Sequence, residues 1–329
     1  MSEHYEVAYS EAGKLVYITD LVTSLQWSGD TGQAARKMQI DHLAKVRIPH
    51  GALITAFYNG EVFMQALAKK FTVKAAAESV QVVAFDFMFQ LLNSTDSKVF
   101  RGMTAKQIVA DVCAAAGVPV GYLEETGYVF DFLPLTEKTL YDMCLIAITE
   151  TTKATGKKYI LKVQKGKVCL FERVKQVHQF VLESNGNLTD ATYSESIEAV
   201  RDKVQLMGKD KAGNSIVSTA QDPALIKQYG VLQEYAKHDQ AVSKAELDEI
   251  AQQMLKDLSA IEKTASVEAL GVCGVEAGDA VYIVEPVTGL IGSYFVDSDQ
   301  HTVQNGLHTM SLVLSWTDKL PSLEYEAPK

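Results

Sequence analysis

The sequence predicts an α+β fold that is mainly β, with an antiparallel β domain at each end of the chain and a small α+β domain between them. Three observations support this prediction. Turn signals typical of β-hairpins recur near both ends, and helix signals gather in the middle and in one later segment. The chain of 329 residues, 47% of them hydrophobic, exceeds what one core usually supports.

These signals also place the domain boundaries. We expect a first β domain over 1–98, the α+β domain over 99–176, and a second β domain over 177–318 with a helical insertion over about 220–262. Residues 319–329, which include a proline near the end, are expected to form a loose tail.

The first β domain starts with two strands over residues 20–40, joined by a Gly-containing turn. On the second strand Met38 and Ile40 share a face with Arg36, so the alternation of apolar and polar residues is imperfect. Trp27 on the first strand is a candidate interface anchor, because aromatic residues dominate binding hot spots, or else a plug of the β domain. We take Trp27 and Arg36 as candidate interface residues.

A β-hairpin is predicted over Leu53–Met64. Its turn is Asn59-Gly60, two residues that tolerate the positive φ of a type I′ turn. Downstream, a strand over 80–85 is expected to run into a short helix over 87–92.

The α+β domain carries complete helix signals. Thr104 and Gln107 form a capping box, and Gly117 ends the predicted helix. Thr136 is the predicted N-cap of a second helix, which Gly156 ends. A hairpin over 159–172, closed over Lys165-Gly166, is expected to complete the domain.

The second β domain includes a predicted strand over 199–207 and is then interrupted. Ser243 and Glu246 form another capping box, and an apolar stripe over 247–261 predicts a helix that covers its own core or docks a partner helix. Strands are expected to resume at Val267 and continue to Trp316.

Three stretches then resemble a known family in the right order. They are 20–40; 80–117, with its strand, Asp86 and helix; and 277–312, with Ala277-Gly278-Asp279 and the run from His301 to His308. Their residue order is similar to that of baseplate hub proteins of contractile phage tails and phage-like bacteriocins, the XkdQ/YqbQ type of PBSX-like tails, which are related to late control protein D-type hubs.

This resemblance implies a structural protein without enzymatic activity or cofactor. In the family, each subunit contributes two tube-like β-barrels, so that a homotrimer presents a quasi-sixfold ring that adapts the sixfold tail tube to the threefold central spike. The implied partners are the spike, the tail tube or tube-initiator protein, and tape-measure, wedge or LysM-type tail proteins. The implied location is the baseplate of a virion or bacteriocin particle.

Composition disfavours several other classes. The net charge is -10, from 41 acidic and 31 basic residues, whereas duplex binding normally needs a basic stripe. The longest apolar stretch, 80–92, is interrupted by polar residues and is too short to span a membrane. The N-terminus lacks a basic region followed by an apolar core, so we expect no signal peptide and synthesis in the cytoplasm.

His301 and His308, with Asp297 and Asp299 nearby, have ligand types that could bind a divalent transition metal. Their spacing is not diagnostic, and a turn at 304–306 places the two histidines on adjacent strands as ordinary polar residues. We therefore predict no metal site.

The remaining reactive residues also favour structural roles. The cysteines lie far apart in apolar settings and are expected to be reduced core residues: Cys113, Cys144, Cys169 and Cys273. The Gly-rich run 271–278 lacks the residue order of a phosphate-binding loop, so turn glycines explain it better.

Two alternatives stay open. A peptidoglycan hydrolase or cell-wall-binding module of the same tail would use paired carboxylates, for which Glu124, Glu125 and Asp131 are candidates. An ordinary cytosolic β-rich binding protein would instead be a stable monomer with a ligand pocket.

Overall fold

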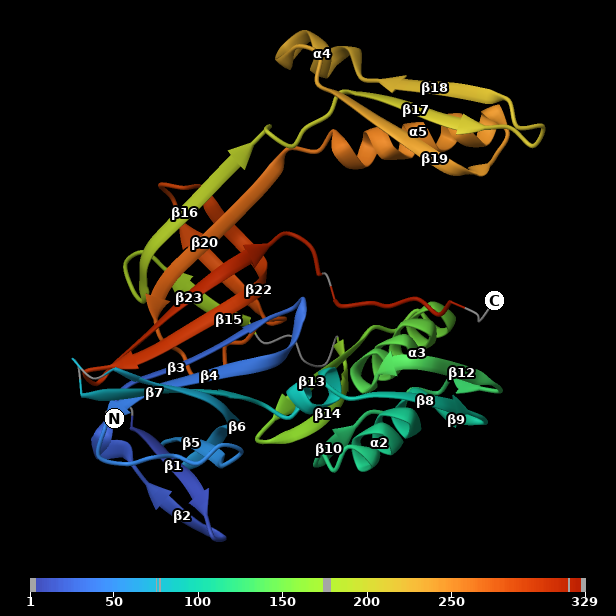
Figure 1. The fold of residues 1–329 in the computed structure, drawn as a ribbon. Helices are drawn as coiled ribbons and strands as arrows, with labels where there is room; N and C mark the ends of the chain where they lie inside the picture. The colour runs from blue at the N-terminus through green and yellow to red at the C-terminus, as the bar shows by residue number, and fades with distance from the viewer. Residues whose placement is uncertain (1–3, 75, 77, 174–178, 319, 327–329) are drawn as a thin grey trace. The chain divides into compact units, whose positions relative to one another are not determined.

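The computed structural model describes residues 4–74, 76, 78–173, 179–318 and 320–326 (Figure 1). The chain forms two compact units. One comprises 1–192 and 266–329, and the other comprises 193–265.

The larger unit is built on a 13-stranded sheet that contains strands from both ends of the chain. In sheet order these are β16 (Leu188–Ser196), β20 (Glu262–Leu270), β23 (Leu307–Ser315), β22 (Leu290–Gln304), β3 (Val22–Asp30), β4 (Gln33–Leu43), β7 (Ser79–Phe85), β6 (Glu61–Lys74), β5 (Leu53–Tyr58), β1 (Tyr5–Glu11) and β2 (Lys14–Tyr17). Off this path, β21 (Ala280–Glu285) pairs with β22, and β15 (Gln179–Glu183) pairs with β21. The one-turn helix η1 (Thr19–Leu21) precedes β3.

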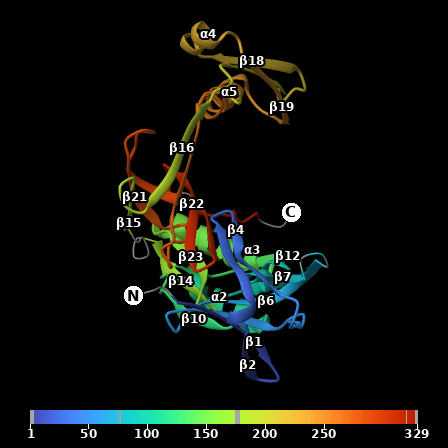
Figure 2. The same cartoon turned by 90° about the vertical axis from the view of Figure 1, so that its left-hand side faces the viewer.

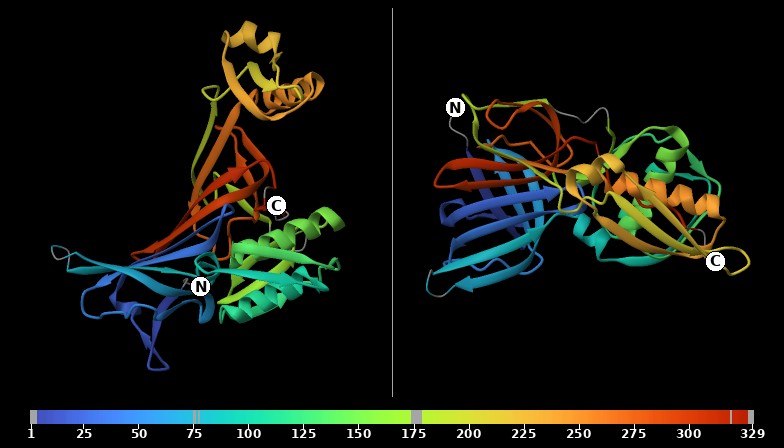
Figure 3. Two further views of the ribbon diagram at one scale, coloured as in Figure 1. Left: turned by 45° about the vertical axis from the view of Figure 1, so that its right-hand side comes forward. Right: turned by 90° about the horizontal axis from the view of Figure 1, so that it is seen from above.

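The two β regions are joined through β22 and β3. Their antiparallel register runs from Ser298 opposite Asp30 to Gln304 opposite Ser24. Figures 2 and 3 show the red C-terminal strands beside the blue N-terminal strands. The expected division into two tube-like β-barrel domains is therefore not confirmed, because in the described residues β22 connects both regions into one path of strands.

The predicted hairpin turns are confirmed by their backbone angles. Asn59 and Gly60 have φ of 50° and 83°, and Lys165 and Gly166 have φ of 48° and 73°. Such left-handed pairs match the twist of the flanking strands. These turn residues therefore fix the register of β5 with β6 and of β13 (Tyr159–Gln164) with β14 (Lys167–Glu172).

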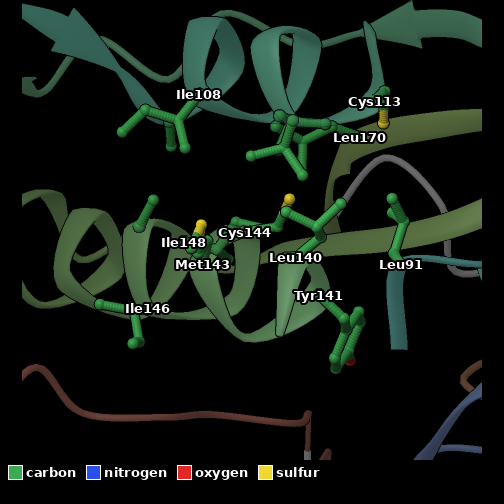
Figure 4. Close-up of a cluster of buried hydrophobic side chains, with 14 of the residues drawn as sticks. Leu91, Ile108, Cys113, Leu140, Tyr141, Met143, Cys144, Ile146, Ile148 and Leu170 are labelled. Atoms are coloured by element: carbon green, nitrogen blue, oxygen red, sulfur yellow. The ribbon is translucent and has the colours of Figure 1, made fainter. Parts of the chain in front are cut away.

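The α+β domain follows the first β region. Its elements are α1 (Met88–Leu92), β8 (Thr95–Phe100), β9 (Met103–Thr104), α2 (Ala105–Ala115), β10 (Val120–Leu123), β11 (Val129–Phe130), β12 (Leu133–Thr139), α3 (Leu140–Thr155), β13 (Tyr159–Gln164) and β14 (Lys167–Glu172). Side chains of α2 and α3 meet in its core, where Ile108 and Cys113 face Met143 and Cys144 (Figure 4). The capping box of Thr104 with Gln107 is present at the start of α2.

The predicted start of the second helix was wrong. Thr136 lies in β12, and α3 begins after Thr139, whose hydroxyl accepts a hydrogen bond from the Asp142 backbone N–H at 3.0 Å. Strand pairing explains the difference, because Leu133 and Leu135 pair with β8 and are buried. Gly156 ends α3 in the left-handed conformation, as predicted.

The expected loose tail was also wrong for residues 320–326, which pack against α3. The Leu323 N–H donates to Thr149 Oγ1 at 3.0 Å, and the Tyr325 N–H donates to Glu150 Oε1 at 3.2 Å. Both Leu323 and Tyr325 contact the core of the α+β domain. This segment contains no helix or strand, so helix and strand signals could not reveal it.

The second unit, 193–265, corrects the predicted helical insertion over 220–262. It contains a separate sheet in the order β18 (Ser215–Gln221), β17 (Lys203–Lys209), β19 (Gln233–Ala241), together with α4 (Pro223–Tyr229) and α5 (Lys244–Leu258). The segment over 199–207, expected in the second β domain, supplies β17 instead. The capping box of Ser243 and Glu246 begins α5, as predicted.

All four cysteines are free, but not all are core residues. Three are buried, whereas Cys273 is only half-buried, which corrects its expected position. Burial raises the pKa of Cys113 to about 12, so its thiol is protonated at neutral pH. No helix in the described part of the chain is long and apolar enough to cross a membrane.

Candidate functional site

The N- and C-terminal β regions are held together by a buried ion pair. Arg36 of β4 donates from Nη1 and Nη2 to Asp299 of β22, at 2.8 and 2.6 Å. The Asp299 side chain is fully buried, and Arg36 is 12% exposed. Burial lowers the pKa of Arg36, but the Asp299 carboxylate outweighs this effect and holds it above its ordinary value.

A second ion pair brings in the α+β domain. Lys162 of β13 lies 3.3 Å from Glu276, in the segment before β21. Burial raises the pKa of Glu276, but the charges of Arg36 and Lys162 lower it by more. The net pKa of Glu276 is below its ordinary value, so the carboxyl stays ionised. We call Arg36, Asp299, Lys162 and Glu276, together with Asp86, the ionic junction.

Asp86 is the unsatisfied member of the ionic junction. Its Oδ1 accepts a hydrogen bond from the Met88 N–H at 3.0 Å, and its Oδ2 has no hydrogen-bond partner among the described residues. Burial raises the pKa of Asp86 to about 7, although the nearby Arg36 acts in the opposite direction.

A chain of hydrogen bonds links side chains of β22, β23 and β1 beside the ionic junction. A carbonyl only accepts, so His301 Nε2 donates to the Val275 carbonyl at 2.9 Å. His301 Nδ1 is then the acceptor for His308 Nε2 at 3.0 Å, and His308 Nδ1 accepts from the Tyr5 hydroxyl at 2.8 Å. Trp27 stacks on His301, with ring centroids 4.8 Å apart and planes 1° apart.

Both histidines are neutral in this arrangement. Burial lowers the pKa of His301 and lowers the pKa of His308 to about 4. Their ring nitrogens are used in hydrogen bonds, and the described ranges contain no group of three or more His, Cys, Asp or Glu residues that could hold a metal ion. The arrangement is that of buried polar residues on adjacent strands.

Gly271 makes this packing possible. A Cβ at Gly271 would collide with the His308 ring, while the Gly271 N–H donates to the His308 carbonyl at 2.9 Å. The Gly-rich run 271–278 predicts turns, and this prediction does not reveal the contact with His308. Close packing of a glycine against a side chain 37 positions away leaves no local sequence pattern.

The two candidate interface residues lie inside the chain. Trp27 is 4% exposed and contacts the histidines, and Arg36 is held by Asp299. In the single chain, neither side chain is accessible enough to contact a partner protein. Their contacts instead connect β3 and β4 to β22.

A cleft of about 240 Å³ borders the ionic junction. Its lining includes Trp27, Asp86, Lys162, Cys273 and Glu276. The charged side chains there are taken up by the ion pairs, apart from Asp86. Of the hydrolase candidates, Glu125 pairs with Lys106, and none of Glu124, Glu125 and Asp131 lines this cleft.

Comparison with known proteins identifies the family. The family model described as YQBQ-like matches residues 25–315. The chain belongs to the YQBQ-like family. It is 30% identical over 240 residues to the uncharacterized protein YqbQ of Bacillus subtilis (strain 168), which covers 72% of this chain and 73% of YqbQ. It is 29% identical over 240 residues to the phage-like element PBSX protein XkdQ of the same strain, covering 72% and 74%.

Solved tail proteins share the fold of this YQBQ-like chain. A 43 kDa tail protein of prophage MuSo2 from Shewanella oneidensis has a TM-score of 0.63 at 14% identity, covering 94% of this chain and 98% of that protein. A tail protein from Neisseria meningitidis MC58 has a TM-score of 0.60 at 13% identity, covering 94% and 96%. The type VI secretion component c3393 of E. coli, described as similar to the T4 tail proteins gp27 and gp5, has a TM-score of 0.54 at 8% identity, covering 93% and 76%.

Proposed function

We propose that this chain is a structural baseplate hub of a contractile tail or tailocin. In this role it forms a homotrimer that adapts a sixfold tail tube to a threefold central spike. The observation that carries the proposal is the fold shared with phage tail proteins over 94% of the chain. Membership in the family of the PBSX protein XkdQ supports the same role.

The ionic junction suits a ring subunit. A subunit that contributes two β regions to a quasi-sixfold ring must keep them in a fixed relation, since a change within one subunit would break the match to its neighbours. The Arg36–Asp299 pair and the β22–β3 register both connect the two regions. The two parallel hydrogen bonds of the buried pair form only in one relative orientation of Arg36 and Asp299, so the pair favours one arrangement of the two β regions.

The proposed partners are the spike, the tail tube or tube-initiator protein, and further tail proteins. The proposed location is the baseplate of the particle. The type VI and phage tail proteins that share this fold support such assembly.

Electron microscopy of the purified chain mixed with its spike protein tests this proposal. We expect threefold-symmetric rings with a central channel, each seated on a spike. Rings of another symmetry would contradict it. Release of soluble fragments from cell-wall sacculi by this chain alone would instead favour the hydrolase alternative.

A further inference from the structure

The sheet of the 193–265 unit has one covered face and one open face. On the covered face, Val204 and Leu206 of β17 pack against Leu247 and Ala251 of α5. Figure 1 shows α5 lying along this sheet. Adjacent residues of a strand point to opposite faces, so Met207 and its neighbours in register belong to the other face.

The open face has an apolar centre. Met207 lies opposite Val217 of β18, and Tyr235 of β19 lies one row away, opposite Gln205. Val217 is 44% exposed and Tyr235 is 46% exposed. The Tyr235 hydroxyl donates to Met207 Sδ at 3.7 Å, which holds the ring across the sheet.

Charged residues on the open face are mainly basic, three lysines against one aspartate. The register assigns to this face Lys203 and Lys209 of β17 and Lys237 of β19. Alternation along β19 adds the exposed Asp239. None of its three lysines forms an ion pair with a described residue. The chain as a whole is acidic, so this basic face is not a consequence of composition.

Two carboxylates of the same unit are engaged elsewhere. Glu234 points to the covered side and lies 3.5 Å from Arg201. Asp248 of α5 accepts from Lys244 and Ser218. Because Lys203, Lys209 and Lys237 form no ion pair with any residue that the structure describes, and Asp239 offsets only one of the three charges, the face stays net positive and an acidic partner would be attracted to it.

We propose that the open face docks an extended acidic segment of another protein. Its carboxylates would pair with Lys203, Lys209 and Lys237, and an apolar side chain would cover Met207 and Tyr235. Lys203 and Lys209 lie about 20 Å apart along β17 at roughly 3.3 Å per residue, a span that about six extended residues match.

A protein segment fits this face better than a nucleic acid. Single-stranded nucleic acids are bound by several stacked aromatic side chains, and Tyr235 is the only aromatic residue that the register assigns to this face. The centre is otherwise aliphatic or thioether in character. The inference concerns this unit alone and does not depend on the proposed hub role.

Fluorescence anisotropy on the full chain tests the inference. The probe is a labelled peptide of about eight residues in which Glu alternates with Val. We expect saturable binding that weakens at least about tenfold when salt rises from about 50 to 300 mM. The triple variant Lys203→Glu, Lys209→Glu and Lys237→Glu is expected to lose at least about tenfold in affinity.

Matched controls separate a specific face from general charge. Lys227→Glu with Lys256→Glu changes lysines of α4 and α5 and should leave peptide binding unchanged. Tyr235→Ser should weaken binding without altering net charge, which keeps the inference testable if the triple variant does not fold. No saturable binding, equal binding of a Lys-Val peptide, tighter binding of a short oligothymidine, or equal loss in the control variant would each overturn it.

Discussion

Arg36 and Asp299 share two hydrogen bonds in the interior although 263 positions separate them in the chain. The pair lies where β3 and β4 meet β22, and the α+β domain reaches the same place through Lys162. The ionic junction therefore connects three parts of the chain that the sequence shows as separate.

Breaking this pair should destabilise the chain strongly. Arg36→Met leaves the buried Asp299 without its cation, and we expect a loss of about 3–5 kcal/mol in the free energy of unfolding. Chemical denaturation measures the loss. Lys165→Met, which breaks an exposed pair with Glu61, is the matched control and should cost at most about 1 kcal/mol. A comparable loss in both variants would contradict the assignment.

Gly271→Ala should disturb the histidine chain. The added methyl group would collide with the His308 ring, and such overpacking typically costs about 1–3 kcal/mol. We expect lower stability together with a changed emission of Trp27, which stacks on His301. The second change His308→Ala should restore part of the loss, and an unrelieved loss would argue against the collision.

Much of the local structure could be predicted from the sequence. Asn59-Gly60 and the capping boxes at Thr104 and Ser243 were sufficient because hairpin turns and helix starts depend on neighbouring residues. The helix start predicted at Thr136 was wrong because the pairing of β12 with β8 continues the strand to Thr139. That pairing depends on residues distant in sequence.

The long-range features could not be predicted in the same way. Arg36 appeared as an imperfection in strand alternation, and only the fold shows that Asp299 accounts for it. The strand β17 showed a normal strand pattern, but no local signal assigns a strand to one sheet or another. The sequence shows a glycine at position 271, but it does not show that this glycine packs against His308.

His308 should make stability depend on pH. Its pKa is about 4 in the fold, below the ordinary 6.5, so the unfolded chain binds the proton more readily. The stability that this group contributes is present above pH 6.5 and is lost as the pH falls toward 4, with a slope of at most about 1.4 kcal/mol per pH unit.

Urea denaturation of the parent and of His308→Gln across this range provides the check. The variant should be less stable at neutral pH but should show a flatter decline toward pH 4. His4→Gln, at an exposed position, should keep the parent slope. An unchanged slope in His308→Gln would show that this histidine does not carry the effect.

Asp86 should act in the opposite direction. Its pKa is raised from 3.8 to about 7, so the unfolded chain loses the proton first and stability falls as the pH rises through this range. Asp86→Asn keeps the acceptor for the Met88 N–H and removes the ionisation. We expect a gain of up to about 4 kcal/mol at pH 8 and little change near pH 4.

The comparison of unfolding free energies at the two pH values decides this prediction. Asp41→Asn, at a carboxylate that accepts from Gln81 on the same sheet, is the control and should show no such gain. A loss of stability at pH 8 in Asp86→Asn would mean that the ionised carboxylate stabilises the ionic junction.

The absolute mass of the purified chain in solution tests the hub proposal most directly. Light scattering at several concentrations, with and without the spike protein, separates the oligomers. A hub predicts three times the chain mass of 36.0 kDa in at least one condition, after subtraction of any bound spike. A stable dimer, or a monomer in both conditions, would contradict the threefold hub.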